Sequence, residues 1–242
     1  EVIGVKENSN GKTGVVYVRS TGYKQDGTEV LDYVRWVMVR KRDPSSPAPE
    51  PVVPDLPEAI EPDGLGDACP FLDTSGWDEA LAGTPWRFDD YKVGERIDHV
   101  DGMTVEEAEH QLATRLYQNT ARVHFNQLSE GQGRFGRRLV YGGHVISLAR
   151  ALSFNGLGAA FHVAGINGGR HVAPLFAGDT VHAWSEILEA ATISGREDVG
   201  ALRVRTIATR DRPCTDFPGS DADGAYDPSV VLDFDYWVLV PR

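Results

Sequence analysis

The chain has few of the features that mark secreted, membrane-bound or nucleic-acid-binding proteins. Only two cysteines, Cys69 and Cys214, occur in 242 residues. They are too few for a disulfide framework and lack the spacing of a metal site. There is no apolar run of about 18 residues and no signal peptide. The formal net charge of −12 argues against nucleic acid or an anionic membrane as a general partner. We therefore expect a cytoplasmic protein that binds neither.

An internal repeat is the first positive feature. Residues 30–39 read VLDYVRWVMV, and residues 231–240 read VLDFDYWVLV. Two upstream pairs of blocks match in the same order: 14–20 with 200–206, and 1–3 with 186–188. Three matched strand-like blocks indicate a duplication, with chance similarity between β-rich segments as the alternative. We expect residues 1–43 to be the last strands of a first unit whose beginning lies outside this chain.

Proline is concentrated between the two copies, with eight prolines from Pro44 to Pro70. Repeated proline removes backbone donors and favours extended geometry, so residues 44–70 are predicted to be a semi-rigid linker. A Pro-rich recognition motif is the alternative. Residues 71–242 then form a second, complete unit.

Two helices and a series of strands are predicted in that second unit. Thr104 and Glu107 have the spacing of a capping box. This spacing predicts a helix of about three turns with these residues on its apolar face: Ala108, Leu112 and Leu116. A second helix is expected to begin near Gly143 and to bury these residues: Val145, Leu148, Ala149 and Leu152. Strands are expected over these ranges: 161–166, 171–175, 180–188, 199–210 and 229–240. One long apolar helix followed by antiparallel strands predicts an α+β fold with a curved sheet around that helix.

The chemically informative residues lie between 117 and 154. Asn119 and His124 are five residues apart, so an amide and an imidazole can face one water molecule. Imidazole exchanges protons near neutral pH, which makes His124 the candidate proton carrier. Gly142 and Gly143 open the apolar helix, where free backbone N–H groups can hold an oxyanion. A histidine buried for packing and a simple turn before a helix are the alternative interpretations.

Three motifs together resemble the MaoC-type dehydratase family, whose members are acyl-CoA hydratases with a double hotdog fold: Asn119-Thr-Ala-Arg-Val-His124, Gly142-Gly143, and the turn from Pro174 to Thr180. The resemblance implies an α+β double hotdog, an antiparallel sheet wrapped around a long central helix, with the first hotdog incomplete in this chain. It also implies a cofactor-free, homo-oligomeric hydro-lyase that adds water to an α,β-unsaturated acyl-CoA. Mesaconyl-CoA is the implied substrate and β-methylmalyl-CoA the implied product. One departure is that the family's usual Asp is here Asn119, which cannot act as a general base.

Substrate-binding positions follow from this expectation. Tyr141 and Gly142 are assigned to substrate binding beside the catalytic set of Asn119, His124 and Gly143. A free carboxylate on the substrate is the type of group that arginine binds in a bidentate fork. Arg122 or Arg170 is the candidate for it, and an ordinary surface salt bridge is an equal alternative for each.

Two further groups of basic residues have weaker interpretations. Three arginines could meet the CoA phosphates, although a solvated loop is the simpler interpretation: Arg134, Arg137 and Arg138. Three histidines lie on predicted strands without a carboxylate or cysteine to complete a metal set: His162, His171 and His182. We predict no metal.

Two other functions are compatible with the sequence. A thioesterase on the same fold would direct water at the carbonyl carbon instead of the double bond. A non-catalytic acyl-CoA-binding subunit is also possible, because Asn119 replaces the acidic member of the family's pair.

Overall fold

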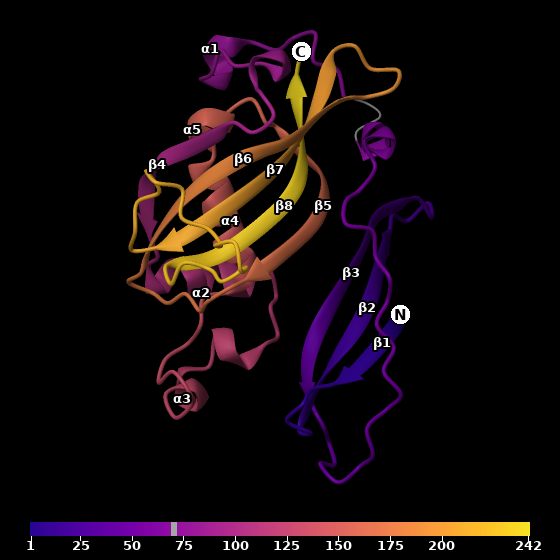
Figure 1. Ribbon diagram of the computed structural model, residues 1–242, viewed down its shortest axis with the longest axis vertical. Coiled ribbons are helices and arrows are strands. Elements are labelled where there is room, and N and C mark those ends of the chain that lie inside the picture. Colours follow the sequence, from indigo (N-terminus) through magenta and orange to yellow (C-terminus); the bar gives the residue numbers. More distant parts are fainter. Residues whose placement is uncertain (69–71) are drawn as a thin grey trace. The chain divides into compact units, whose positions relative to one another are not determined.

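The computed structural model describes residues 1–68 and 72–242 and divides the chain into two compact units (Figure 1), Glu1–Pro57 and Glu58–Arg242. Cys69 therefore lies outside the described residues. The second unit begins inside the segment predicted to be a linker. There, the 3₁₀ helix η1 (Pro62–Ala68) carries Leu65, which is buried with Trp237 and Leu239. The assignment of 44–70 as a linker stays a prediction, and its last part belongs to the second unit.

The first unit contains a three-stranded antiparallel sheet. Its strands are β1 (Val2–Glu7), β2 (Thr13–Tyr23) and β3 (Glu29–Arg40), in the order β1-β2-β3. Alternating β-branched residues favour these strands. Gly11, at φ 63°, supplies the left-handed residue of the β1–β2 turn.

The repeat in the sequence reappears as matched strand pairing. The second unit contains the strands β6 (Thr180–Thr192), β7 (Val199–Arg210) and β8 (Val230–Pro241), which also pair in the order β6-β7-β8. Equivalent residues face each other in the two units: Gly14 with Val39, and Gly200 with Val240. Equivalent cross-strand ion pairs also occur: Arg19 with Asp32, and Arg205 with Asp233. Matched registers and charge pairs support a duplication over chance similarity.

The second unit is a five-stranded antiparallel sheet curved around one helix (Figure 1), which confirms the predicted α+β arrangement. With β4 (Arg96–Thr104) and β5 (His162–His171), the strand order is β4-β6-β7-β8-β5. Helix α4 (Gly142–Leu152) buries the predicted residues: Val145, Leu148, Ala149 and Leu152.

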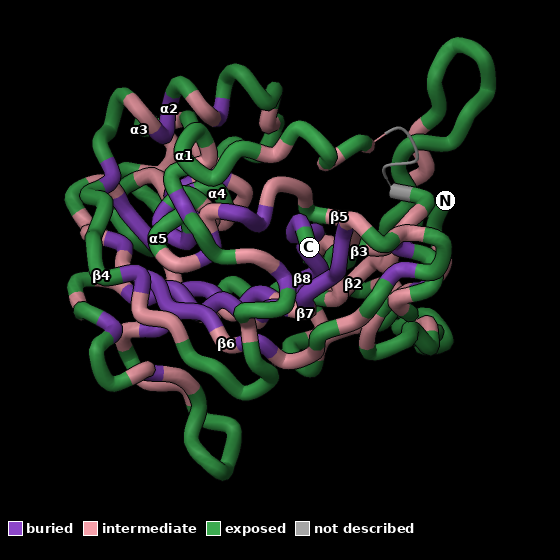
Figure 2. Tube along the Cα trace, turned by 90° about the horizontal axis from the view of Figure 1, so that it is seen from above, coloured by how far each residue is buried: buried purple, intermediate pink, exposed green. Residues whose placement is uncertain are grey.

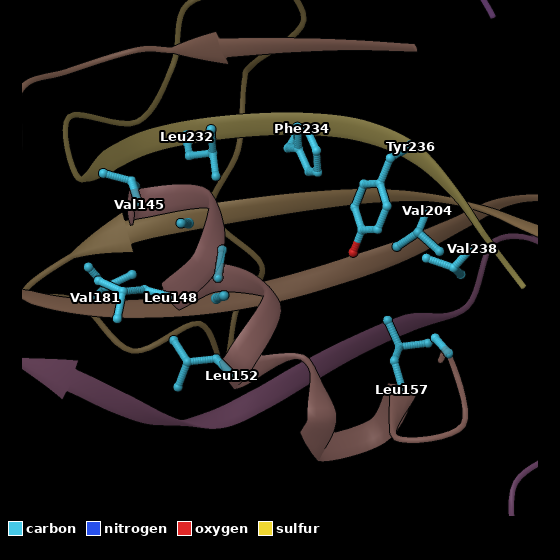
Figure 3. Close-up of a cluster of buried hydrophobic side chains, with 14 of the residues drawn as sticks. Val145, Leu148, Leu152, Leu157, Val181, Val204, Leu232, Phe234, Tyr236 and Val238 are labelled. Atoms are coloured by element: carbon cyan, nitrogen blue, oxygen red, sulfur yellow. The ribbon is translucent and has the colours of Figure 1, made fainter. Parts of the chain in front are cut away.

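The core lies between α4 and the sheet. Figure 3 shows Leu232, Phe234 and Tyr236 of β8 directed toward the helical side of the sheet. Burial is concentrated in the central strands β7 and β8 (Figure 2). Burying one such large apolar side chain stabilises the fold by roughly 1.5–3 kcal/mol. The sheet and α4 therefore share one core.

The helix predicted after Thr104 is present as α2 (Glu107–Leu116), but its predicted cap was wrong. Thr104 ends strand β4, and its hydroxyl is 2.8 Å from the hydroxyl of Thr180. The capping box is formed by Glu106 and Glu109. Pairing of Thr104 within the sheet took precedence over the local capping signal.

The predicted apolar face of α2 was also wrong. Leu112 and Leu116 are 59% and 68% exposed. The buried residues of this helix are polar: His110, Gln111 and Thr114. The four-residue spacing of the two leucines therefore did not identify the face of α2 that packs against the rest of the unit.

Strand β5 differs from the prediction as well. The strands expected over 161–166 and 171–175 are one strand that ends at His171, and residues 172–175 form no strand. The remaining elements are short: α1 (Glu79–Ala82), η2 (Phe88–Asp90), η3 (Arg122–His124), α3 (Gln127–Glu130) and α5 (Phe154–Leu157). In the described parts of the chain, no helix has the length and apolar character needed to cross a membrane.

Candidate functional site

The turn that follows α2 positions His124. Gln118 adopts a positive φ of 50°, and the Asn119 N–H donates to the Thr114 carbonyl at 3.0 Å. The Asn119 side-chain oxygen accepts the Ala121 N–H at 2.8 Å. These bonds reverse the chain and begin the short helix η3, whose last residue is His124.

Polar side chains on the buried face of α2 contact this turn. Gln111 donates its side-chain N–H to the His124 carbonyl at 2.6 Å. His110, fully buried, has Nε2 2.9 Å from the Glu107 carboxylate. Arg138 donates to the same carboxylate at 2.8 Å. The sequence analysis did not single out Gln111 and His110. It assigned the buried face of α2 to the apolar residues, and those residues are exposed.

The His124 ring is oriented as a base. Its Nδ1 lies 3.2 Å from the Leu139 carbonyl. A carbonyl oxygen only accepts, so Nδ1 carries the proton and Nε2 keeps its lone pair. Burial lowers the pKa of His124, the hydrogen bond to Leu139 partly opposes this, and the nearby His110 lowers it further. The ring is therefore neutral at pH 7.

The first turn of α4 supplies backbone donors beside that ring. Tyr141 is the N-cap residue, and Gly142 and Gly143 are the first two helical residues. The N–H groups of such residues have no partner within their own helix, and the helix dipole adds partial positive charge there. The arrangement can hold an oxyanion.

The Tyr141 ring connects the two halves of the site. Its centroid lies 5.7 Å from that of His124, edge to face. A Cβ atom at Gly143 would lie 2.7 Å from the same Tyr141 ring. One aromatic ring is thus in contact with both the imidazole and the helix start, which brings these two predicted groups together.

Gly142 is packed against a residue that the sequence did not single out for catalysis. A Cβ atom at Gly142 would lie 2.5 Å from Nε2 of His171. Burial lowers the pKa of His171, and the neighbouring His124 lowers it further. Strand β5 thus places a second imidazole at the start of α4. In the sequence, its only signal was a histidine at the end of a strand.

His144 has a structural environment. It is buried, and its Nε2 lies 3.1 Å from a Glu109 carboxylate oxygen without the alignment of a hydrogen bond. Burial lowers the pKa of His144, although Glu109 opposes this. The residue packs α4 against α2.

The two candidate carboxylate-binding arginines have different surroundings. Arg122 is exposed on η3, next to the turn that carries His124, and forms no ion pair with any described residue. Arg170 lies over the Tyr226 ring at 5.9 Å, and its positive charge helps to lower the pKa of the Asp233 carboxyl. It adjoins His171 on β5, and successive strand residues point to opposite faces. The structure therefore does not bring Arg170 to the His124 side of the sheet.

The three arginines of the loop before α4 contact other groups. Arg137 stacks on Phe176 at 3.8 Å, and Arg134 lies 5.0 Å from the Phe135 ring centroid. Arg138 forms an ion pair with Glu107. Arg134 is exposed, so it keeps its charge available to a phosphate.

An open depression of about 420 Å³ lies on the Asn119 side of the turn. It is lined by these residues: Thr114, Arg115, Gln118, Asn119, Thr120 and Phe125. Its lining combines a cation, hydroxyls and an aromatic ring. Across residues 1–68 and 72–242, no group of three or more His, Cys, Asp or Glu side chains is placed to hold a metal ion.

Comparison with known proteins gives consistent relatives, although no family model matches the chain. A Chloroflexus aurantiacus protein named beta-methylmalyl-CoA dehydratase is 63% identical over 243 residues, covering 100% of this chain and 68% of the relative. A mesaconyl-CoA hydratase of Cereibacter sphaeroides is 55% identical over 247 residues, covering 100% of this chain and 68% of the relative.

Solved structures give the same result. A MaoC domain protein dehydratase from Chloroflexus aurantiacus superposes with a TM-score of 0.95 at 63% identity, covering 100% of this chain and 69% of that one. A Mycobacterium tuberculosis protein described as a double hotdog superposes with a TM-score of 0.64 at 27% identity, covering 100% of this chain and 68% of that one. These likenesses confirm the hotdog assignment.

Proposed function

Because the chain belongs to the MaoC-type dehydratase family of hotdog proteins, we propose that it is a hydro-lyase that adds water to an α,β-unsaturated acyl-CoA. The relatives' names point to mesaconyl-CoA as substrate and β-methylmalyl-CoA as product. The observation that supports the proposal is that the Tyr141 ring contacts both the His124 imidazole and the first turn of α4.

Each group has a defined role in this reaction. His124 Nε2 removes a proton from water while the water oxygen bonds to the β-carbon. The electron pair of the double bond moves toward the thioester, whose oxygen becomes an enolate held by the Gly142 and Gly143 N–H groups. The protonated His124 then gives its proton to the α-carbon, and the thioester carbonyl is restored. Water is added, and the imidazole ends neutral as it began.

The structure supports only part of the role expected for Asn119. Its side-chain oxygen is bonded to the Ala121 N–H, so that oxygen fixes the turn and, through it, the position of His124. The amide nitrogen remains for a ligand in the adjoining depression. We propose Arg122 as the group that binds the distal carboxylate of the substrate, because it is exposed on the same short helix as His124.

The assembly proposed for the protein is a homo-oligomer. Around the site, α2 and α3 expose large apolar side chains that a second copy could cover: Leu112 59%, Leu116 68% and Leu128 83%. Native mass spectrometry would test this, and a monomer at micromolar concentration would contradict it.

The decisive experiment replaces His124 by Ala and follows mesaconyl-CoA by the absorbance of its conjugated thioester, with free thiol measured in parallel. A hydratase consumes the conjugated thioester without releasing CoA. We expect the variant to lose hydration by at least about 100-fold while its circular dichroism is unchanged. Turnover retained within about tenfold would remove His124 from the mechanism. Release of thiol by the unsubstituted protein would favour a thioesterase, and neither signal would favour a binding subunit.

A further inference from the structure

The attacking water needs a second hydrogen-bond acceptor beside His124. An attacking water has two hydrogens, and His124 Nε2 accepts one of them. The Asn119 oxygen, which the family pattern would place opposite, already accepts the Ala121 N–H. Glu130, the carboxylate that acts on His124 through its charge, accepts a hydrogen bond from Ser129 at 3.0 Å.

The nearby carboxylates of α2 are also engaged. Glu107 binds His110 and Arg138, and Glu109 lies against His144. Because these carboxylates are already paired, an acceptor from another element is the simpler source.

His171 meets this requirement by position. It is the last residue of β5 and pairs with Leu232 of β8, a residue directed toward α4 in Figure 3. Its ring lies so near Gly142 that a Cβ there would be 2.5 Å from Nε2 and 2.8 Å from Cε1. Contact this close is possible only because residue 142 has no side chain. The ring is therefore held against the N-terminus that we assign to the oxyanion.

The ring nitrogens of His171 are also available to a ligand. Within the described chain, neither of its ring nitrogens has a hydrogen-bond partner, and part of the residue's surface is open to solvent, although protein atoms around the ring lower its pKa. Its lowered pKa means that the ring is uncharged at neutral pH and presents one acceptor nitrogen.

We propose that His171 is the second acceptor of the water site, holding the attacking water together with His124 at the start of α4; this rests on the proposed hydratase function. One hydrogen of the water points to His171 and the other to His124 Nε2, so the oxygen lone pair faces the β-carbon. His124 takes the proton and later delivers it to the α-carbon. His171 accepts a hydrogen bond and undergoes no net change in protonation. It supplies a second acceptor beside His124, since the Asn119 oxygen is engaged by the Ala121 N–H of its own turn.

The test compares three variants of the full chain: His171→Ala, His171→Gln and the control His162→Ala. His162 lies at the opposite end of the same strand and has no part in the site. Mesaconyl-CoA hydration gives kcat and KM, and titration calorimetry with butyryl-CoA, a saturated acyl-CoA that cannot be hydrated, gives binding without reaction. We expect His171→Ala to lower kcat by about 100-fold with butyryl-CoA affinity unchanged. His171→Gln keeps an amide acceptor and should recover roughly tenfold of that loss. His162→Ala should match the parent.

Two results would overturn this inference alone. One is a His171→Ala kcat within about threefold of the parent while His124→Ala is inactive. The other is a loss of butyryl-CoA affinity that accounts for the whole loss in kcat/KM, since His171 would then bind the thioester and not the water. Absence of hydration by the unsubstituted protein would instead overturn the proposed function, and this inference with it.

Discussion

Replacing Gly142 by Ala should separate activity from stability, because the three atoms nearest to the new methyl group all belong to the His171 ring. The added Cβ would lie 2.5 Å from His171 Nε2, whereas ordinary contacts begin at 3.4 Å. The ring must therefore move by roughly 1 Å, and a displacement of that size can cost about 100-fold in rate. This corresponds to about 2.7 kcal/mol of barrier.

Stability should change in the opposite direction or not at all. Gly142 lies in the first turn of α4 with no positive φ, so alanine fits the backbone there. Alanine is favoured over glycine within helices by roughly 0.5–1 kcal/mol, which offsets part of the cost of displacing the His171 ring. We expect the urea unfolding midpoint to be within the error of the parent or slightly raised.

The assay is steady-state hydration of mesaconyl-CoA, with unfolding in urea measured on the same preparations. Gly168→Ala is the matched control, because a Cβ there has no neighbour within 4 Å and the residue lies on the strand that carries His171. A Gly142→Ala variant with kcat within about threefold of the parent would refute the reasoning. A large loss of stability would show that the close approach serves packing instead.

Three further predictions concern charge and pH. Arg122→Ala should reduce kcat/KM for mesaconyl-CoA more than for crotonyl-CoA, whose acyl group has no free carboxylate; equal losses would show that Arg122 does not bind that group. Since burial lowers the pKa of His124, the acidic limb of kcat/KM against pH should have its midpoint below about 6.5, and a midpoint above that value would contradict a neutral base. His99 is fully buried between the Asn155 carbonyl and Ser185, and burial lowers its pKa. The unfolded chain therefore binds a proton from about pH 6.5 downward that the folded chain resists, so the free energy of unfolding should fall below that pH and fall less in His99→Gln.

The sequence predicted the elements whose local pattern and tertiary role agree. Helix α4 carries its apolar residues at helical spacing, and the sheet buries that same face. The internal repeat predicted equivalent strands, and these pair in equivalent register. In such segments, the residues that the hydrophobic pattern assigns to one face are the residues that the folded unit buries.

Helix α2 shows where this agreement ends. Its leucines have helical spacing, yet Leu112 and Leu116 are exposed, and the unit buries His110 and Gln111. The reason is that the Gln111 side chain hydrogen-bonds to the His124 carbonyl, thirteen residues further along the chain. A local hydrophobic period does not predict such a contact. A buried polar face is stable only when its partners are in place, and those partners come from other segments.

Local sequence patterns predicted the central helix and singled out His124 and Gly143, because these features rest on residues close together in the chain. The series of strand patterns predicted the fold class. Contacts between distant segments show that His171 faces Gly142, that the Asn119 oxygen is engaged by its own turn, and that Arg170 lies on the other face of the sheet. These contacts depend on strand register and on the direction of side chains across a sheet. A shift of one residue in pairing would exchange His171 for Arg170, and the residue types alone do not reveal which of the two faces the helix.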